Sequence, residues 1–219
     1  MKIVLGLLLS LFSVCSFSQG VITLQDKPFV YNVPVDSTIW NQLELDATFQ
    51  VLSPKEQAFF YWTNVFRRNP KLFYATVVKE FINQFPEANK SEVKSLEKDV
   101  QKAPASLPAL FPDKGLLKMS KLHAADLSKR GGVISHKSAN GKDFAQRMKE
   151  AGSYGCGAEN LFVGNDNPLE ALVMLLIDYG VSDRGHRLNL LESSFGKMGA
   201  SMATVSSKKT VLVQVFACK

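Results

Sequence analysis

The chain lacks several features that mark common functional classes. After the apolar run near its start, the chain has no other long apolar run, so no transmembrane helix is expected. Its 26 Lys and Arg residues outnumber its 20 Asp and Glu residues, but they are scattered and form no stripe interleaved with aromatics, which argues against nucleic-acid binding. Neither a Gly-x-Ser-x-Gly nucleophile elbow nor a phosphate-binding glycine loop is present. These absences exclude a serine hydrolase of that type and a nucleotide-binding loop.

Residues 1–18 have the pattern of a signal peptide. Lys2 provides a positive charge, residues 3–14 are nearly all apolar but too few to span a bilayer, and small residues follow up to Ser18. We expect cleavage after Ser18 and a secreted or periplasmic protein. A lipoprotein anchored through Cys15 is the second interpretation, although Val14 is larger than the residue that usually precedes a lipid-modified cysteine.

Cysteine is scarce, and only Cys156 and Cys218 remain after removal of the signal peptide. In an oxidising compartment an even pair indicates a disulfide, which here would connect the segment before Glu159 to the end of the chain. Two buried free thiols, or metal binding by two isolated cysteines, are the alternatives.

Residues 53–219 are expected to form one domain, preceded by an N-terminal extension over 19–52. The extension contains two prolines and no helical period, which indicates an extended arm or a short pair of strands. The domain is predicted to begin with a helix that has Ser53 as its cap, Pro54 at its first position and Glu56 in its first turn.

Helices dominate the first part of the domain and strands the last part. The apolar spacing predicts further helices over 72–85, 91–101, 114–129, 143–151 and 169–179. Residues 152–167 are rich in glycine and are expected to be irregular. Strands are predicted over 198–205 and 210–217, joined by a turn at 206–209. This order favours an α+β domain in which helices cover an antiparallel sheet.

Two of the three histidines occupy positions suited to a site. His136 and His186 each lie at a glycine-flanked loop or helix boundary, whereas His123 falls inside a predicted helix and is expected to be structural. Glu159 and Asp178 are candidate metal ligands, or else acceptors that fix the imidazoles by hydrogen bonds, and the sequence leaves both roles open. A solvent-facing acid at a helix end is an equal alternative for Asp178.

Two imidazoles make an incomplete zinc site, because zinc takes four ligands and waters or a substrate must supply the rest. We therefore expect His136 and His186 to form an open, weakly held site for zinc or another divalent metal, and no other cofactor.

Four short segments carry a family resemblance. They are Asn-Val-Phe-Arg-Arg-Asn-Pro at 64–70, Leu-His-Ala-Ala-Asp-Leu at 122–127 with Ser135-His136 after it, Ala-Glu-Asn-Leu at 158–161 and Arg-Gly-His-Arg-Leu-Asn-Leu-Leu at 184–191. In this order they resemble bacterial members of the CAP superfamily, also called the SCP/PR-1-like or cysteine-rich secretory protein family. The resemblance covers about 53–219, and the last segment is its most specific part.

The resemblance implies an α-β-α sandwich with a central antiparallel sheet and a cleft that holds two histidines and two acids. Matched by motif, this tetrad is His136, Glu159, Asp178 and His186, and in some members it binds zinc or another divalent ion. The chain departs from the family pattern in three ways: Leu175 replaces a tryptophan, Ala158 replaces a glycine, and Asp178 is one methylene shorter than the usual glutamate.

The resemblance and the absence of a recognised nucleophile favour a secreted, non-enzymatic module that binds a protein, a lipid or a cell-surface ligand. We expect it to be a monomer. The alternative is a zinc-dependent hydrolase, a protease or esterase, in which His136 and His186 hold a zinc-bound water and Glu159 is the catalytic base. A third interpretation is a surface protein in which the polar cluster only organises loops.

Overall fold

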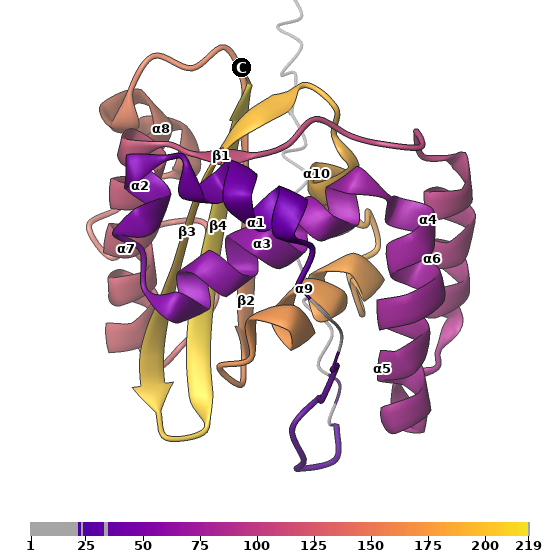
Figure 1. Ribbon diagram of the computed structural model, residues 1–219. Helices are drawn as coiled ribbons and strands as arrows, with labels where there is room; N and C mark the ends of the chain where they lie inside the picture. Colours follow the sequence, from indigo (N-terminus) through magenta and orange to yellow (C-terminus); the bar gives the residue numbers. More distant parts are fainter. Residues whose placement is uncertain (1–21, 23, 33–34, 219) are drawn as a thin grey trace, which may run out of the picture.

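The structure is a computed structural model that describes residues 22, 24–32 and 35–218 (Figure 1). The expected signal peptide over 1–18 and the alternative lipid site at Cys15 lie outside the described residues. Within the described part of the chain, no helix is both long and apolar enough to cross a membrane.

The helical elements and strands occur in the following order along the chain. They are α1 (Ser37–Glu44), α2 (Ala47–Gln50), α3 (Pro54–Arg68), α4 (Pro70–Phe73), the π-helical turn η1 (Tyr74–Val78), α5 (Lys79–Gln84), the 3-10 turn η2 (Pro86–Ala88), α6 (Ser91–Lys102), β1 (Phe111–Pro112), α7 (Lys114–Lys129), α8 (Phe144–Ala151), β2 (Gly157–Gly164), α9 (Pro168–Ile177), α10 (Gly185–Leu191), β3 (Phe195–Ser206) and β4 (Lys209–Cys218).

The strands form one sheet in the order β1-β3-β4-β2. The long strand β4 pairs antiparallel with β3 on one side and with β2 on the other, whereas the short β1 pairs parallel with β3. Figure 1 shows α7 and α8 on one side of this sheet and α3, α9 and α10 on the other. The α+β fold with a central, mainly antiparallel sheet between helical layers is thereby confirmed.

Alternation along β4 explains how the sheet supports a core on each face. Val211, Val213 and Val215 pack in one cluster with apolar residues of α7. Leu212 and Phe216 point the other way and pack with α3 and α9 in a second cluster. Successive side chains of a strand point to opposite faces, so a strand that buries apolar side chains on both faces needs helices on both sides.

Close contact between α7 and the sheet depends on one glycine. A Cβ added at Gly199 of β3 would lie 2.2 Å from the backbone carbonyl carbon of Leu116 in α7. The absence of a side chain therefore lets the helix backbone rest directly on the strand.

The local helix signals of the sequence are confirmed. Ser53 and Glu56 form a reciprocal capping box at the start of α3, with Pro54 at the first helical position. Asn167 caps α9 with its side chain, and Pro168 follows it. These signals act over three or four residues, which is why they can be identified without knowledge of the fold.

Two sequence predictions are wrong. Residues 152–167 are not irregular throughout, because 157–164 form β2 and pair residue by residue with β4. The extension over 19–52 is not only an arm or strand pair, because it contains α1 and α2, which Asp36 and Asp46 cap with their side chains. The extension also contributes to the main core, through its buried residues Phe29, Ile39, Leu43 and Phe49.

The predicted disulfide between Cys156 and Cys218 is present, with its Cα atoms 5.4 Å apart. It joins the residue before β2 to the last residue of β4, and so closes the end of the antiparallel pair that the two strands form. In the chain-entropy view, a bridge across a separation of 62 residues stabilises the fold by about 4 kcal/mol.

Candidate functional site

Glu159 reaches the site because of its register in the edge strand β2. It lies opposite Val215 of β4, and the side chains of Leu161 and Val163 pack in the same cluster as Val215, against α7. Glu159 therefore points to the face of the sheet covered by α7 and α8. Its side chain is fully buried in a protein interior, where an isolated carboxylate would be costly.

Three cationic or imidazole groups surround the Glu159 carboxylate. Arg147 of α8 places Nη2 2.7 Å from each of its two oxygens. The Nδ1 of His136 lies 2.9 Å from Oε1, and the Nε2 of His123 lies 3.9 Å from the same oxygen. The buried charge is thus compensated mainly by Arg147, and His136 is held at its edge with 47% of its side chain exposed.

Arg147 also fixes the loop that carries His136. Its Nη1 donates to the backbone carbonyl of His136 at 2.8 Å, and approaches the hydroxyl of Ser138 at 3.3 Å and the carbonyl of Lys142 at 3.4 Å. Arg147 is a site residue that the sequence did not indicate, because a single arginine on a short amphipathic helix looks like a solvated surface charge.

His123 lies inside a helix, α7, as the sequence predicted, and it is buried with both ring nitrogens in contact with the following loop. Its Nε2 lies 2.9 Å from the Ser135 carbonyl, which can only accept, so Nε2 carries the proton and Nδ1 accepts from the Ser138 hydroxyl at 3.2 Å. Burial lowers the pKa of His123 below its ordinary value of 6.5, and the nearby Glu159 carboxylate opposes that shift. His123 therefore serves as a neutral support for the loop between α7 and α8.

Asp178 and His186 form a second pair on the other side of β2. The Nδ1 of His186 lies 2.7 Å from Oδ1 of Asp178, and the backbone amides of His186 and Arg187 donate to Oδ2 at 3.1 and 3.2 Å. Asp178 is buried and adopts a left-handed backbone with φ of 63°, which an aspartate tolerates better than most residues. The alternative of a solvent-facing acid is wrong, since Asp178 is 2% exposed and its side chain accepts from amides of α10.

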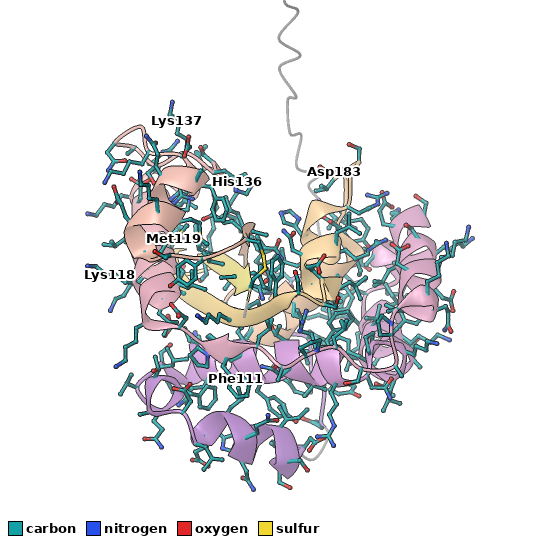
Figure 2. All side chains as sticks on the ribbon, turned by 90° about the horizontal axis from the view of Figure 1, so that it is seen from above. Phe111, Lys118, Met119, His136, Lys137 and Asp183 are labelled. Carbon is teal, nitrogen blue, oxygen red and sulfur yellow. A yellow bond between two sulfur atoms is a disulfide. The ribbon has the colours of Figure 1, made fainter. Side chains whose placement is uncertain are left out.

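The two pairs are connected through Asn160, the residue that follows Glu159 in β2. Its Nδ2 donates to the His186 carbonyl at 3.2 Å and to the Gln214 side chain at 3.1 Å, and its Oδ1 accepts from Asn189. Two adjacent residues of the edge strand β2 thus contact the two pairs. Glu159 is part of the pair with His136 on one face of the strand, and Asn160 contacts His186 on the other face. In Figure 2, His136 and Asp183 lie on the two arms of the molecule that flank the sheet, the first beside α8 and the second just before α10.

The pairing determines what each imidazole can offer a ligand. Both rings use Nδ1 on a carboxylate, and among the described residues neither Nε2 has a hydrogen-bond partner. A carboxylate on Nδ1 orients an imidazole so that Nε2 is the coordinating or basic nitrogen. Glu159 and Asp178 therefore occupy the role of orienting acceptors, which is one of the two roles left open by the sequence.

The donor set fits a divalent metal only in part. Two imidazole nitrogens are half of the ligands that zinc takes, and the acids are already engaged with Arg147 and with backbone amides. In the part of the chain that the structure describes, no group of three or more His, Cys, Asp or Glu side chains is arranged to hold a metal ion. Waters or a partner would complete any coordination at these nitrogens.

We predict that Arg147→Met lowers the free energy of unfolding by about 3 to 5 kcal/mol, because it leaves the Glu159 charge buried without its partner. Urea denaturation measures this change. The double variant Arg147→Met/Glu159→Gln should lose less than the sum of the single variants, since it removes the unpaired charge. Arg130→Met is the matched control, as its pair with Asp126 is partly exposed and worth about 1 kcal/mol or less. Equal losses in Arg147→Met and Arg130→Met would contradict the assignment.

We predict that His123 makes the protein less stable in acid. Because the pKa of His123 is lower in the folded protein, the unfolded chain binds more protons below about pH 6.5. The contribution of neutral His123 to the free energy of unfolding is complete above about pH 6.5. This contribution is lost as the pH falls from there toward the lower pKa of the folded protein. The free energy of unfolding should be measured for the native chain and for His123→Gln from about pH 8 to about pH 5. On acidification the native chain should lose more of this free energy than His123→Gln does. Parallel curves would show that His123 contributes no pH dependence.

The family model described as the cysteine-rich secretory protein family, CAP, matches residues 61–218. No curated protein matches the chain. Similar solved structures include an extracellular protein with an SCP domain from Bacillus anthracis, an outer surface protein from Borrelia burgdorferi and venom allergen-like protein 4 from Schistosoma mansoni.

The Bacillus structure is 21% identical with a TM-score of 0.49, and the match covers 87% of this chain and 46% of that one. The chain thus spans less than half of the Bacillus chain. The Borrelia structure is 22% identical with a TM-score of 0.44, covering 59% of this chain and 88% of that one. The Schistosoma structure is 12% identical with a TM-score of 0.45, and the match covers 77% of this chain and 91% of that one. Because the family model spans most of the sequence, the chain belongs to the cysteine-rich secretory protein (CAP) family.

Proposed function

We propose that this CAP protein is a non-enzymatic binding module that acts outside the cytoplasm and uses His136 and His186 to bind a divalent metal or a partner. The observation that carries the proposal is the geometry of the two imidazoles. Each is held through Nδ1 by a buried carboxylate, at 2.9 Å for His136 and 2.7 Å for His186, which leaves Nε2 available.

Rigid support of both rings favours binding. His136 is fixed by the Arg147 contact to its carbonyl, and His186 by the Asp178 contact to its own amide. Side chains that are positioned before a ligand arrives lose little conformational entropy on binding. A bound divalent ion would add a fixed positive charge and open coordination positions for water or for an acidic group of a partner.

The alternative, a zinc-dependent protease or esterase, requires Glu159 to act as a general base. Both Glu159 oxygens are 2.7 Å from Arg147, and one of them is also 2.9 Å from His136. A carboxylate whose two oxygens both face donors within the protein is directed at those donors and away from a substrate or a metal-bound water. The contacts of Glu159 therefore support an orienting role in a binding site over a catalytic one.

An extracellular role accords with the signal-peptide pattern over 1–18 and with the Cys156–Cys218 disulfide, since disulfides persist in oxidising compartments. The partner is a protein, a lipid or a cell-surface ligand, and the protein is proposed to bind it as a monomer.

Zinc titration of the purified mature chain by calorimetry tests the proposal. We expect binding near neutral pH that weakens by about tenfold or more in His136→Ala and in His186→Ala, because each removes one ligand. His123→Gln is the control and should bind zinc as the native chain does, since the His123 ring already uses both nitrogens within the protein.

The result that would contradict metal binding is an affinity unchanged in both alanine variants. Turnover of peptide or ester substrates would instead support the hydrolase if zinc restores it to the metal-depleted native chain and if it is absent from His186→Ala.

A further inference from the structure

A groove of about 670 Å³ lies between α7, α8 and the loop that joins them. It is separate from the hollow beside His136, which is lined by residues 134–137 and 143–145. The volume falls within the range of pockets that hold small organic molecules. The function proposed above does not use this groove, although Arg147, which holds Glu159, forms part of its inner wall.

The walls of the groove are largely apolar. Met119, Leu122 and Ala125 contribute from α7, Ala139 from the loop and Ala151 from the end of α8. Leu122 is 63% exposed, which is unusual for a large aliphatic side chain on a helix that packs on a sheet. An apolar body that entered the groove would cover this surface and be stabilised by about 25 cal/mol for each Å² removed from water.

The charges around the groove do not cancel. Lys142 is paired with Glu150 at 2.5 Å, and Asp126 is engaged by Arg130 and by the amide of Ala139. Lys118 and Lys129 also line the groove, and neither has an acidic partner within ion-pair distance among the described residues. Two lysines at one apolar groove therefore have no compensating acid.

The inner wall adds one more donor without a partner. Arg147 lines the groove and is more than nine-tenths buried, and its Nε has no hydrogen-bond acceptor among the described residues. The other nitrogens of its guanidinium serve Glu159 and the loop carbonyls. An unpaired buried donor costs stability, and this one belongs to a residue in the wall of a groove that already carries these two lysines.

From these observations we infer that the groove binds a small organic anion with an apolar body, such as an aromatic or aliphatic carboxylate or sulfonate. The apolar body lies on Met119, Leu122 and Ala125, and the anionic group is held by Lys118 or Lys129. A lysine ammonium binds an oxyanion by charge and hydrogen bonding, and the apolar wall selects amphiphiles over inorganic anions.

Two fluorescent probes test this inference in the mature chain. Anilinonaphthalene sulfonate carries the anionic group, and the uncharged phenyl-naphthylamine has the same rings without it. The variant Ala125→Trp fills the groove, and Lys121→Trp, on an exposed position of the same helix outside the groove lining, is its control. The charge reversal Lys118→Glu/Lys129→Glu is matched by Lys94→Glu/Lys98→Glu on the exposed face of α6.

We expect saturable binding of the sulfonate to be lost in Ala125→Trp and retained in Lys121→Trp. The charge reversal on α7 should weaken it by about tenfold, and that on α6 should leave it within about twofold. The uncharged probe should bind more weakly to the native chain and be insensitive to both charge reversals. Circular dichroism establishes that each variant is folded.

Sulfonate binding that survives Ala125→Trp would overturn the site, and equal effects of the two charge reversals would overturn the role of Lys118 and Lys129. Tighter binding of the uncharged probe would overturn the anionic class of ligand. The zinc titration is independent of these measurements, so failure of either proposal leaves the other intact.

Discussion

The buried ion pair between Arg147 and Glu159 is the interaction on which the site depends. Glu159 sits in the edge strand β2, on a face that is otherwise apolar, and its charge is tolerated because Arg147 contacts both oxygens at 2.7 Å. The same guanidinium holds the His136 carbonyl, so one arginine stabilises the carboxylate and positions the loop that brings the imidazole to it. Pairing of β2 with β4 sets the position of Glu159 opposite Val215, and Arg147 and His136 reach it from α8 and from the loop before α8.

The other half of the site is built by different means. Asp178 ends α9 with a left-handed backbone and accepts from the amides of His186 and Arg187, so the same carboxylate that holds the His186 ring also anchors the helix that carries it. Arg187, fully buried, fixes α10 by donating to the carbonyls of Leu176 and Ile177 and to Asp99. Both imidazoles are thus supported by a buried carboxylate and a buried arginine, one set on each side of β2.

The sequence predicted the features that depend on neighbouring residues and missed those that depend on distant ones. The cap and proline at Ser53 and Pro54 signal α3 correctly, because capping acts within one helical turn. Strand β2 was missed because its glycines and polar residues give no strand pattern, and it exists through its pairing with β4. Motif resemblance pointed to the two histidines and two acids that the structure pairs with each other, but Arg147 lies in a segment without a motif, and only the fold brings it to Glu159.

The central claim is that each site imidazole is held through Nδ1 and offers Nε2 to a ligand. Nitrogen NMR of the histidine rings, recorded at alkaline pH where the neutral ring is present, tests it directly. The account predicts that His136 and His186 carry their proton on Nδ1, while His123 carries its proton on Nε2. Finding His136 and His186 protonated on Nε2 and unprotonated on Nδ1 would contradict it, because such rings could not donate to Glu159 and Asp178.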